Sequence, residues 1–217
     1  PEQMTVVLAV GAPVLDPLPA YTNKPDARIN GKADPAATIT LYVTDSRNNK
    51  TQAGQATADD QGAFGIDVHL SVDGTYKFTA IASKDGQRSA ESLPIPMTLD
   101  RVLPAAPQKS AWFSAAYDEV LLQWESAEPV GSLKFHILRG GVEIGTTEET
   151  EFRDTGLTEQ SAVSYTLISE DLAGNRSPGI TVQAGTLPDR LTFLGTSETG
   201  EMGNGGFSPP VISGDGN

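Results

Sequence analysis

The side chains most able to do acid–base chemistry in this sequence are its two histidines, His69 and His136. Imidazole changes its charge near neutral pH, which makes histidine a frequent general acid or base and a frequent metal ligand. Each histidine lies where apolar and polar residues alternate, and each falls on the polar side of that alternation. We therefore expect both to be exposed on strands, with no nucleophile nearby, and we predict no catalytic residue and no enzymatic activity.

Carboxylates are the second group with chemical potential, because a glycosidase places two of them across a cleft and raises the pKa of one by burial. The densest group is Glu148, Glu149, Glu151 and Asp154. These residues fall on predicted turns and strand edges, where acidic side chains also discourage pairing with other chains. We interpret the group as a solvated acidic face.

Aspartates in predicted turns are candidate calcium ligands, because this ion takes oxygen atoms from loops. Asp59, Asp60, Asp73 and Asp85 lie in turns, and Asp100 is the one nearest the boundary between the two halves of the chain. There is no EF-hand spacing, and aspartates in turns commonly accept hydrogen bonds from local backbone amides instead. We expect no cofactor, with calcium at Asp100 as the alternative.

Carbohydrate binding would need exposed aromatic rings on which sugars can stack, and aromatic residues make up 6% of the chain. Trp124 falls on an apolar strand face and is expected in a core. Trp112, Tyr42 and Tyr117 remain as candidates, and they form no clear row. Carbohydrate as a ligand therefore stays open.

The elements that position these residues must be mostly strands. The 217 residues include 22 glycines and 15 prolines, which interrupt the chain too often for a helical protein. The absence of cysteine excludes disulfides, thiol catalysis and zinc ribbons, and favours a bacterial over an animal extracellular protein. A net charge of −13 argues against nucleic acid and against an anionic membrane surface. No apolar run is long enough to span a bilayer.

The charge is unevenly distributed. Residues 1–103 hold 9 basic and 12 acidic side chains, a net of −3, whereas residues 104–217 hold 6 and 16, a net of −10. The change coincides with the proline-rich stretch 103–107, which is typical of a short stiff linker. We predict four parts, which are a β-prone segment, two domains and a Gly/Pro-rich tail, at residues 1–12, 13–103, 104–186 and 187–217.

In both domains, apolar residues recur at every second position, as in a β-strand with one buried face. Apolar residues alternate with polar ones over 38–44 and 64–70 in the first half, and over 120–124, 133–137 and 163–167 in the second. Turn signals such as Asp-Gly pairs separate these stretches. The pattern predicts an all-β protein built from two tandem β-sandwiches with extended N- and C-terminal segments.

The second half resembles a bacterial fibronectin type III domain from about residue 107 to 186. The segments that carry the resemblance are 122–124, 135–141, 152–157, 163–165 and 171–177. The resemblance implies that Trp124 lies in the core and that Tyr165 forms a tyrosine corner, in which the phenol bonds to nearby backbone.

The first half, from about residue 13 to 104, resembles a bacterial Ig-like domain of the type found in adhesins and secreted multidomain proteins. The matching segments are 29–31, 35–39, 60–64 and 73–76. The stretch 83–89 also parallels 169–177, and each follows a strand that carries a tyrosine, Tyr76 or Tyr165. Both families serve mainly as spacers and binding scaffolds, so the resemblance implies the fold more than the function.

Two terminal segments fall outside these domains. Residues 4–10 are an apolar, β-prone run that we expect to pair with an edge of its own domain or with a neighbouring subunit. The tail, residues 187–217, contains too few apolar residues to be held against its own domain. We therefore expect it to bind a partner by strand addition or in a groove. The predicted partner-binding residues are the large apolar ones of both segments, Val6, Leu8, Val10, Phe193, Phe207, Val211 and Ile212.

The sequence therefore predicts a non-catalytic structural or interaction protein of a bacterial extracellular or cell-surface assembly. A filament, pilus, surface layer or adhesin would be such an assembly, and the chain would be fastened through its termini to a protein partner or to copies of itself. The alternative is that the chain supplies accessory domains of a secreted polysaccharide-degrading enzyme.

Overall fold

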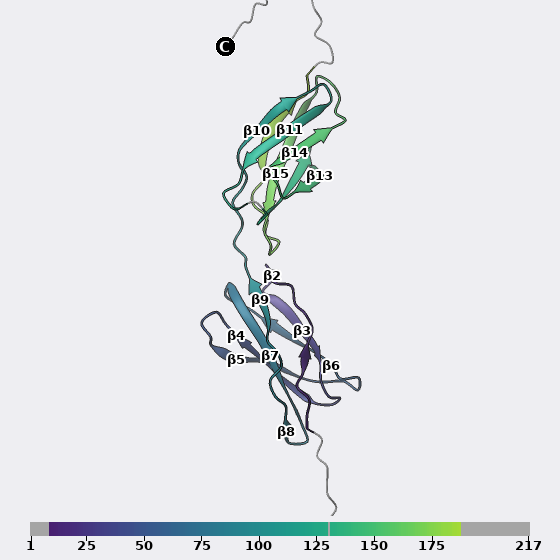
Figure 1. Ribbon diagram of the computed structural model, residues 1–217, viewed down its shortest axis with the longest axis vertical. Helices are drawn as coiled ribbons and strands as arrows, with labels where there is room; N and C mark the ends of the chain where they lie inside the picture. The colour runs from purple at the N-terminus through teal and green to yellow at the C-terminus, as the bar shows by residue number, and fades with distance from the viewer. Residues whose placement is uncertain (1–8, 130, 188–217) are drawn as a thin grey trace, which may run out of the picture.

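The computed structural model describes residues 9–129 and 131–187, with only the backbone described for 109–115. Within these ranges the chain is built from strands and contains no helix, so no helix of this part is long and apolar enough to cross a membrane. The strands form two β-sandwiches that follow each other along the long axis of the molecule (Figure 1). The predicted fold class is confirmed.

The first sandwich consists of two facing sheets. Its strands are β1 (Val14–Leu15), β2 (Tyr21–Thr22), β3 (Asp26–Lys32), β4 (Thr38–Thr44), β5 (Lys50–Thr57), β6 (Ala63–His69), β7 (Gly74–Lys84), β8 (Gln87–Arg88) and β9 (Ile95–Leu99). One sheet has the order β1-β3-β6, and the other has the order β2-β9-β7-β4-β5 with β8 paired to β7. The short β2 lies parallel to β9, whereas the other pairings are antiparallel.

The core of the first sandwich follows the predicted alternation. Ile39 and Leu41 of β4 are fully buried, and Phe64 and Ile66 of β6 face them from the other sheet. Phe78 of β7 is likewise fully buried. Successive side chains of a strand point to opposite faces, so each strand contributes every second residue to the core.

The second sandwich has the same plan with fewer strands. They are β10 (Gln108–Ala115), β11 (Glu119–Glu125), β12 (Lys134–Arg139), β13 (Val142–Thr147), β14 (Glu151–Thr155), β15 (Ala162–Glu170) and β16 (Ile180–Gly185). The sheets have the orders β10-β11-β14 and β13-β12-β15-β16. Trp124 is 5% exposed and forms a T-shaped pair with Phe135, with ring centroids 5.2 Å apart, so its predicted core position is confirmed.

Tight turns occur where the sequence places Asp-Gly or Gly-Gly between strands. Asp85 and Gly86 join β7 to β8 with φ of 49° and 76°, and Gly140 and Gly141 join β12 to β13 with φ of 58° and 86°. Two consecutive positive φ values define the type I′ turn, whose twist matches that of antiparallel strands. These turns fix the register of their hairpins.

Candidate functional site

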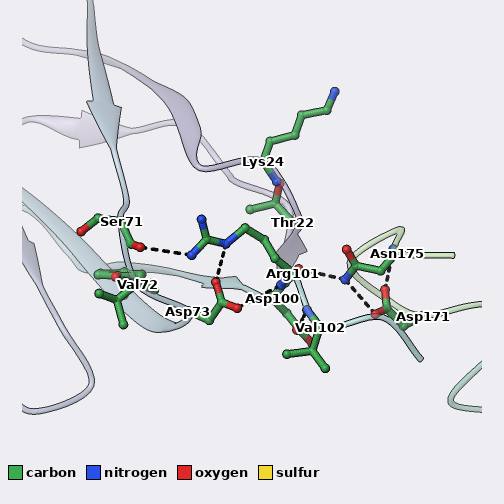
Figure 2. Close-up of polar contacts among 11 residues, drawn as sticks. Thr22, Lys24, Ser71, Val72, Asp73, Asp100, Arg101, Val102, Asp171 and Asn175 are labelled. Carbon is green, nitrogen blue, oxygen red and sulfur yellow. Dashed lines mark hydrogen bonds and ion pairs between the residues drawn. The ribbon is translucent and has the colours of Figure 1, made fainter. Parts of the chain in front are cut away.

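The feature of this molecule that brings distant residues together is the junction between the two sandwiches, drawn in Figure 2. The linker leaves β9 at Leu99 and enters β10 at Gln108. Side chains from both sandwiches bond to its backbone, and Pro104 and Pro107 are buried. The predicted linker is therefore held against the domains on both sides.

The first sandwich holds its end of the linker through Arg101. Its Nε donates to Asp73 Oδ1 at 2.6 Å, and its Nη2 donates to the backbone carbonyl of Ser71 at 3.1 Å (Figure 2). The amide of Asp100 donates to the carbonyl of Thr22 at 2.9 Å, which continues the β2–β9 pairing by one residue. These bonds fix the direction in which the chain leaves the first sandwich.

The second sandwich reaches back to the same place through Asn175, which lies in the loop between β15 and β16. The Asn175 Nδ2 donates to the carbonyl of Asp100 and to Asp171 Oδ2, both at 2.9 Å (Figure 2). Asn175 is 6% exposed and Asp100 is half-buried, so this cross-domain bond is partly shielded from water. A buried polar group left without its partner lowers stability by about 1–3 kcal/mol. This bond should therefore favour the observed arrangement of the two domains over arrangements that break it.

Further along the linker, Ala105 is bonded through both of its backbone polar groups. Its amide donates to Glu128 Oε1 at 3.2 Å, and its carbonyl accepts from Ser169 Oγ at 2.6 Å. Ser169 is fully buried. The linker therefore has anchors in both sandwiches within a few residues, which limits rotation between them.

The loop that carries Asn175 is a local structure that recurs in the first sandwich. Asp171 Oδ1 accepts from the amides of residues 173 and 175, and Asp45 Oδ1 accepts in the same way from the amides of Arg47 and Asn49. In both loops the fifth residue is an asparagine that donates to the aspartate Oδ2 at 2.9 Å. Hydrogen bonds from Asn49 are the main cause that lowers the pKa of Asp45. Each loop is thus stabilised by its own hydrogen bonds. One Nδ2 hydrogen of Asn175 bonds Asp171 within the loop, and the other bonds the Asp100 carbonyl across the junction.

Asp100, the predicted calcium ligand, lies at the centre of this junction. Its Oδ1 accepts from the amide of Val102 at 2.9 Å, a local bond of the kind that aspartates make in turns. Among the described residues, no three histidine or acidic side chains gather in a way that would hold a metal ion. Calcium at Asp100 stays a prediction.

A second polar cluster lies inside the second sandwich. The Tyr165 hydroxyl donates to Asp154 Oδ2 at 2.6 Å, and Arg139 Nη1 donates to both oxygens of Asp154 at 3.0 Å. Tyr165 is fully buried and Asp154 is 7% exposed. Burial first, and then the hydrogen bond to Asp154 and its charge, raise the pKa of the Tyr165 phenol well above its ordinary value.

This cluster corrects two sequence-based interpretations. Asp154 is not part of a solvated acidic face, because β14 turns its side chain toward Arg139 and Tyr165. Tyr165 also bonds to a side chain and not to nearby backbone. The backbone contact of a tyrosine corner occurs in the first sandwich, where the Tyr76 hydroxyl donates to the carbonyl of Val72 at 2.5 Å.

The histidines have different environments. His69 is exposed and pairs with Asp26 at 2.7 Å, as an exposed strand histidine would. His136 also points away from the core, but the prediction that it is exposed is wrong. It is 5% exposed because Glu143 of β13 and Glu170 of β15 cover it from the neighbouring strands.

His136 makes one hydrogen bond to these carboxylates and one further close contact. His136 Nδ1 lies 2.9 Å from Glu143 Oε2, and Nε2 lies 3.1 Å from Glu170 Oε2 without hydrogen-bond geometry. Burial raises the pKa of Glu170, but the hydrogen bond from Arg176, followed by the charges of Arg176 and His136, outweighs it and lowers the pKa overall. Each partner lies on an adjacent strand, so the group ties the sheet together across three strands.

The predicted partner-binding residues fall mostly outside the described ranges. Val6, Leu8, Phe193, Phe207, Val211 and Ile212 are in that position. Val10 is half-buried and packs against the core of its own sandwich. Of the aromatic candidates, Tyr117 is 49% exposed and Tyr42 is half-buried on the outer face of β4.

Sequence reasoning missed the residues that hold the junction, namely Arg101, Asn175 and Ser169. A signal is present in the sequence, because residues 169–177 parallel residues 83–89 and carry part of the resemblance to a fibronectin type III domain. The two hairpins do correspond, since Ser89 Oγ accepts from the amide of Ala82 and Ser177 Oγ accepts from the amide of Ser169. The bond from Asn175 to the other domain could not be read from this local pattern.

Together these features define the class of protein: it has the fold of two tandem sandwiches of the Ig-like and fibronectin type III kind. No protein-family model matches the chain. It is similar to Bacillopeptidase F of Bacillus subtilis, with 28% identity over 163 residues, which is 75% of this chain and 11% of that protein. It is also similar to Exoglucanase B of Cellulomonas fimi, with 28% identity over 181 residues, which is 73% of this chain and 16% of that protein.

Among solved structures, the chain is similar to fibronectin(III)-like modules of Clostridium thermocellum CbhA. The TM-score is 0.53 at 17% identity, and the match covers 82% of this chain and 96% of that chain. This likeness confirms the fold. The chain spans only 11% and 16% of the two curated relatives, so it corresponds to a part of each of them.

Proposed function

We propose that this chain is a non-catalytic, extracellular spacer that holds two parts of a larger bacterial protein at a fixed separation, as an accessory segment of a secreted enzyme would. The observation that carries the proposal is the doubly anchored linker, in which Arg101 fixes one end, Asn175 bridges the domains and Ser169 binds the other end. A spacer that swings freely needs no such bonds, since relative motion is the default for domains with small interfaces.

The similarity to parts of a bacillopeptidase and an exoglucanase supports the accessory role, because both are named as enzymes and the matched region is a small fraction of each. The arrangement of the sandwiches suits it as well. The first described residues leave the first sandwich at the end away from the linker, and the chain leaves the second sandwich at its far end (Figure 1). Neighbouring parts on either side would therefore be kept apart by the length of both sandwiches.

Pulsed electron–electron double resonance, which measures the distance between two spin labels, tests the fixed separation of the two sandwiches in the full chain. Because the chain contains no cysteine, spin labels can be attached at Thr57→Cys in the first sandwich and Glu149→Cys in the second, both exposed positions. We expect one narrow distance distribution for this doubly labelled protein. A broad distribution would contradict the proposal.

The matched perturbation is Asn175→Ala, which removes the cross-domain bond and should broaden the distribution. Asn49→Ala is the control, because Asn49 makes the same bond to its loop aspartate without a second bond across the junction. If both variants broaden the distribution equally, or neither does, the junction is not what fixes the separation.

A second candidate function is a subunit of a surface assembly that is fastened through its termini to a partner or to copies of itself. It is favoured by the position of the first and last described residues at opposite ends of the pair of sandwiches, an arrangement that suits head-to-tail contacts. Sedimentation velocity of the full chain across a range of concentrations tests it. Concentration-dependent growth that is lost on deleting residues 188–217 would favour this function, and a monomer at every concentration would reject self-assembly.

A further inference from the structure

The outer face of the first sandwich contains a hollow of about 390 Å³ that the spacer role does not use. It lies over β4 and β5, and the hairpin of β7 and β8 contributes part of its lining. The residues that line it are mostly polar, and those used below are Tyr42, Gln52, Gln55, Ser83, Gln87 and Arg88.

An irregularity in β5 brings two of the glutamines to this face. Leu41 of β4 pairs with Gly54, but its neighbour Tyr42 pairs with Gln52, so Ala53 is an extra residue in the ladder. In a regular strand, residues three apart point to opposite faces. The bulge at Ala53 resets that alternation, and Gln52 and Gln55 therefore line the same hollow.

These amides are available for a ligand. Gln55 Nε2 donates one hydrogen to Thr40 Oγ1 at 3.0 Å, which orients the amide and leaves its carbonyl oxygen to accept. Within the described residues, the side chains of Gln52 and Gln87 take part in no hydrogen bond, and both residues are exposed. A side-chain amide donates and accepts at once, which matches the hydroxyl groups of a sugar.

The hollow carries one full charge, the guanidinium of Arg88. Arg88 is exposed, and no ion pair or hydrogen bond of the described residues engages its side chain. None of the described lining residues is acidic, although the chain as a whole has a net charge of −13. An unpaired guanidinium with its planar fork of donors is well suited to a carboxylate.

The neighbouring charges do not neutralise it. Lys50 lies with its ammonium 4.9 Å from the centre of the Tyr42 ring and forms an ion pair with Glu91, so these two are satisfied by each other. The hydrogen bond from Lys50 is the main cause that lowers the pKa of Glu91. Asp85 lies in the turn before Gly86 and does not line the hollow.

We propose that this hollow binds a sugar unit that carries a carboxylate, with Arg88 pairing the carboxylate and the three glutamines bonding the ring hydroxyls. We favour a sugar over an acidic peptide, because the lining is built mostly from amides and hydroxyls, which match the many hydroxyl groups of a sugar ring. The proposal goes beyond the spacer role, since a rigid spacer needs no ligand.

The test is a titration of the full, ¹⁵N-labelled chain with a mannuronic acid trisaccharide, followed by two-dimensional NMR. The side-chain amide signals of Gln52, Gln55 and Gln87 are direct probes. We expect them to shift on titration, and we expect high salt to weaken the binding because Arg88 is exposed. Arg88→Gln should weaken binding about tenfold or more, as expected for loss of a hydrogen bond between charged groups.

Two comparisons make the result decisive. Arg47→Gln changes the same charge on an exposed loop of the same sandwich and should leave the affinity unchanged. Mannotriose, which has the hydroxyls but no carboxylate, should bind about tenfold more weakly than the mannuronic acid trisaccharide. Equal binding of mannotriose, equal binding of a glutamic acid peptide at the same amides, unchanged affinity in Arg88→Gln, or no shift of the three glutamine signals would each overturn the proposal.

Discussion

The buried contact between Tyr165 and Asp154 gives a prediction that can be worked out in both size and pH dependence. Tyr165→Phe removes the hydroxyl that donates to Asp154 at 2.6 Å, while Arg139 continues to bond both oxygens of that carboxylate. A hydrogen bond to a charged group contributes about 1.5–3 kcal/mol, and no cavity is created. We expect the free energy of unfolding of the second sandwich to fall by that amount at neutral pH.

The difference between the two proteins should shrink in alkali. The folded state raises the pKa of Tyr165, whereas in the unfolded chain a tyrosine titrates near pH 10. Above pH 10 the unfolded state therefore loses a proton that the folded state keeps, and stability falls by up to about 1.4 kcal/mol per pH unit. Tyr165→Phe has no such proton, so its stability should not show this loss.

Urea denaturation followed by tryptophan fluorescence measures the effect in the correct domain, because both tryptophans, Trp112 and Trp124, lie in the second half of the sequence. Tyr76→Phe is the control, since it removes a tyrosine hydroxyl from the first sandwich and should leave the tryptophan transition unchanged. The reasoning is refuted if Tyr165→Phe costs less than about 0.5 kcal/mol, the size of an ordinary surface substitution. It is also refuted if both proteins lose the same stability above pH 10.

Three other perturbations have expected outcomes. Asp154→Ala leaves a buried hydroxyl and a partly buried guanidinium unpaired and should cost about 3–5 kcal/mol in the same urea assay, whereas the exposed Glu149→Ala should cost less than about 0.5 kcal/mol. The folded state lowers the pKa of Glu170, so the ionised Glu170 stabilises the fold above about pH 4.5, and this stabilisation is lost as the pH falls. In urea titrations between about pH 5 and 3, Glu170→Gln should therefore lose less stability than the unmodified protein. Gly62→Ala and Gly86→Ala place a side chain at φ of 77° and 76°, but only the first brings a Cβ to 2.2 Å from the Ala33 carbonyl, so circular dichroism should show a clearly larger fall in melting temperature for Gly62→Ala.

The strands and cores could be predicted from the sequence because their signal is local. Where one face of a strand is buried, the alternation of apolar residues records it directly, as at Ile39 and Leu41 or at Phe135 and Ile137. Asp-Gly and Gly-Gly turns are equally local, since their φ values depend on the residues at the turn itself. These local signals therefore predict most of the strands, their buried faces and the tight turns between them.

The environments of individual polar residues could not be predicted in the same way, because they depend on the neighbouring strands. The alternation places His136 correctly on the outer face, but its burial comes from Glu143 and Glu170, whose register relative to β12 is not encoded in the local alternation. Asp154 sits in a run of acidic residues and is nevertheless buried, since Arg139 and Tyr165 meet it from the other sheet.

The candidate site at the junction shows the same limit at a longer range. The loop 171–175 was recognisable as a motif, but the same motif with the same internal bonds occurs at 45–49 without any cross-domain contact. What distinguishes Asn175 is the position of the Asp100 carbonyl, which comes from the packing of the two domains. The local motif predicts an asparagine donor at Asn175, but its acceptor, the Asp100 carbonyl, is brought near only by the packing of the two domains.

The unequal attachment of the strands at the two ends of the first sandwich bears on how the molecule would respond to mechanical tension. At the end away from the linker, β1 pairs with β3 over two residues, Val14 and Leu15, with one further bond from the Asp16 amide to the Asn30 carbonyl. At the linker end, β9 is paired over five residues with β7 and is flanked by β2 and the Arg101 contacts. A pull along the long axis should therefore peel β1 away before the junction yields. This step would take Leu15 out of the first core, while the remaining strands of both sandwiches stay paired.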